Sequence, residues 1–235
     1  WCMLMLRVKF TKENYLKYIS HLDLMRLFNR TFRRAGIPIK YTEGFNPQPK
    51  FSIANPLALG IESISEYMDI DLEEEIPVED FIKRMNDELP KQIRILEGKY
   101  IEDDRSLSSL VGMSHYEINF SFEKLEDEIE LKELIDKWLE KDEIIIKKIK
   151  RKRGKIKERE QNIRPLIGNI LINSQYAQSA ELNCLLKSGD RGNLKPIDLI
   201  DAMDKEFNLN IDSDSIEIKR ISLFLEDDGK IQLPI

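Results

Sequence analysis

The sequence is poor in the residues that build metal and disulfide sites. Its 235 residues include two cysteines and two histidines. With only His21 and His115, a multi-histidine metal site cannot form, and we expect neither a metal nor a cofactor. Cys184 lies in an apolar run, and we expect it to be a small buried hydrophobic residue. The scarcity of cysteine also favours a reducing, cytoplasmic setting.

Several familiar signatures are absent as well. No apolar run approaches the ~20 residues of a membrane-spanning helix, and no signal peptide is recognisable. The sequence contains no C-x-x-x-C-x-x-C, Walker, G-x-G-x-x-G or nucleophile-elbow motif. We therefore expect a cytoplasmic protein without membrane contact. We leave enzyme activity open and favour a protein that has none of its own.

Charge is plentiful but unevenly distributed. The net charge is −6, which argues against a generic nucleic-acid binder. Acidic runs occupy residues 69–79, 123–133 and 212–217, whereas basic runs occupy residues 26–34 and 147–159. This segregation predicts local basic surfaces on an acidic protein.

Two similar segments suggest a duplicated design. Asp80–Leu89 reads DFIKRMNDEL and Asp198–Phe207 reads DLIDAMDKEF, and a proline lies shortly before each, Pro77 and Pro196. Both patterns are typical of amphipathic helices with an acidic first turn. Alternating apolar residues predict strands before and after them, in the order β-α-β-β-α-β in each half.

That order predicts an α+β fold made of two tandem ferredoxin-like halves with antiparallel sheets and a projecting basic β-hairpin. We expect an N-terminal half over residues 5–101, a polar linker over 102–114 and a C-terminal half over 115–235. The basic hairpin is expected within residues 143–172.

A basic helix is predicted at residues 21–35. Ser20 can cap its start together with Asp23, and Gly36 and Pro38 can end it. One face of the helix is apolar, and the opposite face carries Arg26, Arg30, Arg33 and Arg34. Arginine presents a planar fork that suits phosphate, so this face is either a phosphate-binding surface or an ordinary solvated one.

His21 stands at the first position of this helix. It is the candidate catalytic residue of the sequence, because a histidine near a helix N-terminus can contact an anion or transfer a proton. The alternative is a residue that packs locally.

The loop that follows, Gly44–Lys50, contains glycine, asparagine and two prolines. Phe45 within it either offers a stacking platform for a base or plugs the edge of the sheet. Lys50 is a candidate anion contact. Asp69 and Asp71 alternate with apolar residues, so they are expected on a solvated face of a strand. The alternative is a carboxylate pair for acid–base work or Mg²⁺ binding.

Further basic candidates lie in the second half. The predicted hairpin has its tip near Gly154, and either contacts RNA or an acidic protein, or only protects a sheet edge. The loop 188–195 is either an anion-binding nest or a turn. The candidate residues are Lys147, Lys148, Arg151, Arg153, Arg191 and Lys195.

Four segments of the first half carry a family resemblance: Tyr18–Asp23, Arg33–Gly36, Gly44–Pro47 and Gly60–Asp71. Together with Ile163–Pro165 and the loop before Pro196, they resemble the radical-SAM-associated (radical-SAM-linked) protein family, a domain of unknown function. The resemblance implies a bacterial protein that is fused to, or encoded beside, a radical-SAM enzyme. The architecture is also similar, more weakly, to the RAMP-type CRISPR-associated ribonucleases.

The residues and the resemblance together favour a non-catalytic accessory module of a radical-SAM system. Such a module would bind RNA, tRNA or rRNA, through the basic helix and loop. Two alternatives stay open. One is an RNA-processing or RNA-modifying enzyme subunit that uses His21, and the other is a protein-interaction adaptor for a radical-SAM partner.

Overall fold

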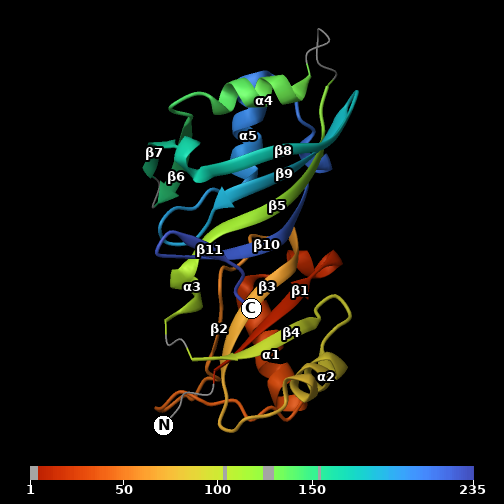
Figure 1. Ribbon diagram of the computed structural model, residues 1–235, viewed down its shortest axis with the longest axis vertical. Helices are drawn as coiled ribbons and strands as arrows, with labels where there is room; N and C mark the ends of the chain where they lie inside the picture. Colours follow the sequence, from red (N-terminus) through yellow and green to blue (C-terminus); the bar gives the residue numbers. More distant parts are fainter. Residues whose placement is uncertain (1–4, 103–104, 124–129, 153–154) are drawn as a thin grey trace. The chain divides into compact units, whose positions relative to one another are not determined.

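The computed structural model describes residues 5–102, 105–123, 130–152 and 155–235 (Figure 1), with the side chains of 149–152 and 155–157 left out. The fold is mixed α+β and consists mostly of strands. Contacts divide the chain into unit 1, Trp1–Met113 with Lys219–Ile235, and unit 2, Ser114–Ile218. Among the described residues, no helix has the length and apolar character that crossing a membrane requires.

Unit 1 contains a sheet in which β1 lies between β4 and β3, antiparallel to both. Short β2 pairs with β3, which also neighbours β10, and β11 extends β10. The elements are β1 Met5–Lys12, α1 His21–Arg34, β2 Phe51–Ile53, β3 Ile61–Asp71, α2 Val78–Glu88, β4 Ile95–Ile101, α3 Leu107–Leu110, β10 Glu217–Asp227 and β11 Lys230–Gln232.

The helices α1 and α2 lie together beside this sheet (Figure 1) and bury their apolar faces with it in one core. Phe28 of α1 meets Phe10 of β1 edge-on at a ring distance of 5.1 Å. Phe51 of β2 meets Phe32 in the same way, also at 5.1 Å. Because Phe51 directly follows the Gly44–Lys50 loop, this packing ties the end of that loop to α1.

Local signals set both ends of α1. The side chain of Ser20 accepts a hydrogen bond from the backbone N–H of Asp23 at 3.1 Å, which confirms the predicted cap. Gly36 follows the helix in a left-handed conformation, with φ +59°. Arg84 of α2 donates to the carbonyl of Ala35 at 2.9 Å and also to that of Gly36. A cation therefore satisfies the C-terminal carbonyls, where the helix dipole is negative.

Unit 2 contains the strand order β5-β9-β8 and a separate two-stranded sheet, β6-β7. The strand β9 alternates regularly, so that Ala180, Leu182, Cys184 and Leu186 are buried. Its elements are β5 Val111–Ser121, α4 Leu131–Leu139, β6 Ile145–Lys152, β7 Lys155–Asn162, β8 Ile167–Tyr176, β9 Ser179–Lys187 and α5 Pro196–Phe207.

The two helices with similar sequences bury corresponding residues. In α2 these are Phe81 and Met85, and in α5 they are Leu199 and Met203. Proline stands at the N-cap of α2 and at the first position of α5. In unit 2, Trp138 of α4 meets Phe207 of α5 edge-on at 5.6 Å, which joins the two helices.

The segment expected to be a polar linker, residues 102–114, is partly regular. Residues 107–110 form α3, and β5 begins at Val111. The reason is apolar burial: Leu107, Leu110 and Val111 join Leu223 and Leu225 of β10 in a second core of unit 1. The polar residues of this segment therefore accompany a buried apolar stripe.

Candidate nucleic-acid interface

The predicted basic face of α1 is exposed to solvent. All four arginines are exposed, while Leu24, Phe28 and Phe32 on the other side of the helix are buried. At 100° per residue, the arginine positions fall within about a third of the helix circumference. We call Arg26, Arg30, Arg33 and Arg34 the arginine face.

Carboxylates within unit 1 neutralise two members of the arginine face. Arg26 pairs with Asp23 at 3.1 Å, one turn earlier in the helix. Arg34 pairs with Glu88 at the end of α2 at 2.9 Å, and also donates to the Glu88 carbonyl at 2.8 Å. Arg34 therefore helps to join α1 and α2.

Arg30 and Arg33 differ from these two. In the part of the chain that the structure describes, neither has a carboxylate within 4.0 Å. Two exposed guanidinium groups, three residues apart on one helix face, are thus available to an external anion.

The loop after the helix is closed at its base. Tyr41 and Pro49 form an isolated antiparallel β-bridge, and the N–H of Thr42 donates to the carbonyl of Gln48 at 2.8 Å. The N–H of Gln48 donates back to the Thr42 hydroxyl at 2.9 Å. The tip of the loop carries Phe45, which is fully exposed and so does not plug the sheet edge. An exposed aromatic ring on a closed loop is a feature of single-strand binding surfaces.

Lys50, at the end of this loop, is exposed, and its backbone N–H donates to the carbonyl of Lys40 at 2.7 Å. Its side chain adds a further positive charge to unit 1. The arginine face and the loop with Phe45 and Lys50 are the elements of unit 1 that can contact an anionic ligand.

His21 is exposed at the start of α1 and borders a hollow with Lys12, Leu24 and Glu66. The hollow has a volume of about 10 Å³, enough for about one water molecule. Lys12 is buried there, and its ammonium donates to the carbonyls of Lys17 and Ile19 at 3.4 and 3.3 Å. Burial lowers the pKa of Lys12, against the opposing effect of Glu66.

Two ion pairs lie almost completely inside unit 1. Glu66 of β3 binds the guanidinium of Arg220 of β10 through both carboxylate oxygens, one at 2.8 Å. Asp69 binds Arg7 in the same two-pronged way, at 2.8 and 3.0 Å. These pairs are bidentate and buried, so they are structural rather than open to a ligand.

The burial of Asp69 corrects the expectation of a solvated face. Asp69 lies directly opposite Arg7 in the β1–β3 register. Arg7 also donates to the carbonyl of Pro234 at 3.3 Å, which brings the end of the chain onto this pair. The strand therefore has both faces covered over much of its length, and alternation in the sequence does not reveal that.

Of the candidate basic residues in unit 2 whose side chains the structure describes, two form ion pairs and two lie in a turn. Lys147 pairs with Glu158 of β7 at 3.0 Å, and Lys148 pairs with Asp198 of α5 at 2.8 Å. Arg191 and Lys195 are exposed in the turn before α5. The predicted contacts of Arg151 and Arg153, and the tip at Gly154, lie outside the described residues or side chains.

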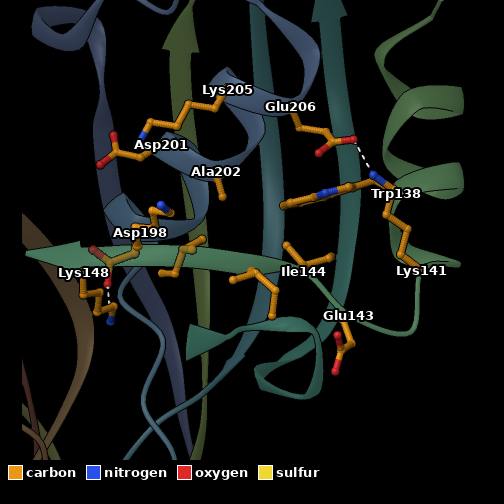
Figure 2. Close-up of a pocket in the computed structure, with 13 residues that line it drawn as sticks. Trp138, Lys141, Glu143, Ile144, Lys148, Asp198, Asp201, Ala202, Lys205 and Glu206 are labelled. Atoms are coloured by element: carbon orange, nitrogen blue, oxygen red, sulfur yellow. Dashed lines mark hydrogen bonds and ion pairs between the residues drawn. The ribbon is translucent and has the colours of Figure 1, made fainter. Parts of the chain in front are cut away.

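A larger hollow lies in unit 2, between β6 and α5 (Figure 2). Its volume is about 570 Å³. Trp138, Ile144, Ile146 and Ala202 give it apolar surface. We call this hollow the α5 groove. The pair between Lys141 and Glu206, at 2.5 Å, stands beside Trp138 at one end, and the Lys148–Asp198 pair stands at the other (Figure 2).

One carboxyl in the α5 groove has a perturbed acidity. Partial burial raises the pKa of Asp201, and Lys205, one turn later on α5, acts in the opposite direction. The residues that border the groove come from two stretches of sequence, 138–148 and 198–206. The groove is not recognisable in the sequence, because each stretch alone has the pattern of an ordinary amphipathic helix or basic strand. The one local signal is the small Ala202 on the buried side of α5.

Among the described residues, no group of three or more histidine, cysteine, aspartate or glutamate side chains could hold a metal ion. His115, the other histidine, lies 2.8 Å from the side-chain oxygen of Asn183 and is partly buried.

Comparisons with known proteins give a family and a fold. Residues 5–196 match the model of a family described as "Uncharacterized protein conserved in bacteria (DUF2344)". No curated protein matches. One solved structure with a similar fold is a chain of "Crystal Structure of a Cbf5-Nop10-Gar1 Complex", with a TM-score of 0.52 and 11% identity. The match covers 95% of this chain and 50% of that chain, so the protein spans about half of its neighbour.

Proposed function

We propose, from the premise that the chain belongs to the uncharacterized bacterial family DUF2344, that it is a non-catalytic accessory protein that binds structured RNA for a radical-SAM partner. The observation that carries the proposal is the pair Arg30 and Arg33, which are exposed on one helix face without a carboxylate partner in the described part of the chain. Arg26, Lys50 and the exposed ring of Phe45 would extend this contact.

The chemistry suits RNA better than a small anion. Two guanidinium groups and a lysine can each neutralise a phosphate, and an aromatic ring can stack on an unpaired base. These groups are exposed on the surface of unit 1, and the hollow next to His21 has room for about one water molecule. Exposed groups spread over a helix and a loop fit a macromolecular ligand better than a small anion.

We further infer that both halves derive from one ferredoxin-like design. The support is the matching pair α2 and α5, which share two buried positions of a similar sequence, Phe81 with Leu199 and Met85 with Met203. Under this proposal the arginine face is a special feature of the first half, because the corresponding helix α4 has two basic and two acidic residues and no arginine.

The proposal is tested by fluorescence anisotropy with labelled bacterial tRNA. Arg30→Glu plus Arg33→Glu should weaken binding strongly at low salt and should reduce the slope of log K against log salt by about two, because two phosphate contacts are lost. Phe45→Ala in the same assay should weaken binding while leaving the salt slope unchanged, since stacking releases no counterions.

A matched control is Lys83→Glu plus Lys91→Glu, which changes the net charge equally at two other exposed positions of unit 1. If both double variants weaken binding alike, the interaction depends on net charge and the arginine face is not the site. If the unchanged protein does not bind tRNA or rRNA at low salt, the proposed function is wrong.

The enzyme alternative is separated by incubation of cellular RNA with the protein. We expect the RNA to remain intact, because the proposed protein is non-catalytic. RNA cleavage that disappears in His21→Ala would instead favour the enzyme.

A further inference from the structure

The α5 groove borders a strand edge rather than a strand face. Five consecutive residues, 144–148, contribute to it. Side chains of a strand alternate between its two faces, so a hollow against one face would be bordered by every second residue only. A consecutive run indicates that the edge of β6 is turned toward the groove.

The hydrogen bonds of the hairpin show which backbone groups point to that edge. The carbonyl of Ile144 accepts from the N–H of Ile163 on the β7 side at 2.8 Å. In an antiparallel pair such residues alternate with residues whose N–H and carbonyl point outward. The unbroken register from Ile145↔Asn162 to Lys147↔Glu160 therefore directs the backbone groups of Ile145 and Lys147 away from β7.

Within the described chain, β7 is the strand that pairs with β6. The outward groups of Ile145 and Lys147 thus form a short, open edge beside a hollow with apolar surface. Lysines alone would protect such an edge from aggregation. Protection of the edge does not explain the groove of about 570 Å³ that lies next to β6 and is lined by Trp138 and Ala202.

We propose that β6 and the α5 groove bind an extended segment of a partner protein, which adds to β6 as a strand. Main-chain hydrogen bonds to Ile145 and Lys147 would hold the segment, and its apolar side chains would enter the groove. Beyond the groove, β6 continues through Lys150, Arg151 and Lys152. The segment that fits is therefore apolar beside the groove and acidic beyond it. This inference does not rest on RNA binding by unit 1.

Charge distinguishes this partner from the other candidates. The groove is bordered by four lysines and four acidic residues, so it has no net charge to attract a polyanion such as RNA. A second copy of the chain would set β6 against β6. Five of its eight residues are basic and none is acidic, and like charges opposite each other destabilise a strand pair.

The test uses the full chain and the labelled peptide Glu-Thr-Glu-Thr-Glu-Val-Thr-Ile-Thr-Val, whose acidic half would face residues 148–152 in an antiparallel alignment. Lys147→Pro removes one outward N–H and leaves the bonds to β7 in place, which an edge strand tolerates. We expect the peptide to bind, and Lys147→Pro to weaken binding about five- to tenfold, as loss of a main-chain hydrogen bond predicts.

Two variants and a second peptide control the result. Lys147→Val removes the charge but keeps the N–H, and should bind within about twofold of the unchanged protein. Glu160→Pro makes the same backbone change on the opposite edge of the hairpin, and should have no effect. Circular dichroism checks that all variants fold.

The same peptide with N-methyl groups at alternate residues should not bind, because it cannot form one set of ladder bonds. Equal binding of both peptides, or equal loss in Lys147→Pro and Glu160→Pro, would overturn the proposal. Displacement of the peptide by RNA, with an affinity for RNA that falls equally in Lys147→Pro and Lys147→Val, would show that the edge is a nucleic-acid surface instead. Neither result depends on Arg30 or Arg33, so the two proposals fail separately.

Discussion

Burial separates the charged residues of unit 1 into two groups with different roles. Arg7, Glu66, Asp69 and Arg220 are at most 5% exposed and form bidentate pairs. Removing one member of such a pair leaves an uncompensated buried charge and costs about 3–5 kcal/mol. Arg30 and Arg33 are exposed and can exchange water for a ligand at little cost to the fold. Searches for function should therefore start from the second group.

Burial also makes the chemistry of a single uncharged residue predictable. Cys184 is completely buried in β9, as its apolar surroundings in the sequence predicted, and desolvation raises its pKa from 9.0 to about 12. The thiolate is the reactive form, so Cys184 in the folded protein should resist modification at neutral pH. Cys2, the other cysteine of the chain, is replaced by serine so that only Cys184 can react. In this Cys2→Ser variant, we expect an aromatic disulfide reagent to label Cys184 no faster than the protein unfolds.

The same shift has a consequence for stability. The unfolded thiol ionises near its ordinary pKa while the folded thiol stays protonated, so the free energy of unfolding should fall as pH rises from about 9 toward 12. Comparing urea titrations of Cys2→Ser with and without Cys184→Ala at both ends of this range isolates the effect. Rapid labelling at neutral pH, at a rate unchanged by urea, would show that the thiol is accessible.

At the scale of elements, the sequence predicted what depends on local chemistry. The helix expected at residues 21–35 is α1, and its cap at Ser20 and its end at Gly36 follow from neighbours within four residues. The similar segments that contain Asp80 and Asp198 are both helices.

Features that depend on distant residues were not predictable. Asp69 is buried against Arg7 of β1, and Arg7 also binds the carbonyl of Pro234; both are far from Asp69 in sequence. The α5 groove is lined by both Trp138 of α4 and Ala202 of α5, and so depends on the packing of two helices that are distant in sequence. The pairing of Arg34 with Glu88, which leaves Arg30 and Arg33 as the open members of the arginine face, requires two helices to meet.

The N-cap of α1 provides a test at this scale. Ser20→Ala should lower the free energy of unfolding by about 1 kcal/mol, because it removes the acceptor for the Asp23 N–H. The Ser20 hydroxyl also donates a hydrogen bond to the Asp23 carboxylate at 2.7 Å, and this second bond is the main reason that the pKa of Asp23 is lowered. In Ser20→Ala this pKa should therefore rise toward its ordinary value. Urea denaturation and an NMR titration of Asp23 measure the two effects.

Ser20→Asn is the matched control, since asparagine caps helices about as well as serine. It should restore most of the stability. Equal losses in both variants would mean that Ser20 acts through packing rather than through its cap. Because Asp23 is ionised more readily in the folded state, its contribution is present at neutral pH and is lost as pH falls through its lowered pKa.

At the scale of the whole molecule, the chain returns to unit 1 after building unit 2. Residues 219–235 belong with the first 113 residues. They supply Arg220 to Glu66, Asp227 to Arg105 at 2.9 Å, and the Pro234 carbonyl to Arg7. Leu223 and Leu225 of this segment complete the second core of unit 1. No local pattern in this segment states where it packs, so the dependence of unit 1 on it is a property of the tertiary structure alone.

A chain that stops at Ile218 tests this dependence. It would leave Glu66 buried without its cation and would expose the core around Leu107 and Val111, each of which costs several kcal/mol. Since a typical domain is stable by about 5–15 kcal/mol, we expect unit 1 to unfold while unit 2 persists. Hydrogen exchange should show protection lost in β1 and retained in β8 and β9, whose pairing lies within unit 2.

The control is a longer chain that ends after Asp227 and so keeps the whole of β10. It should recover protection in β1, because Arg220 again pairs with Glu66 and the leucines of β10 again fill the second core. Full protection of β1 in the chain that ends at Ile218 would show that unit 1 is stable without residues 219–235.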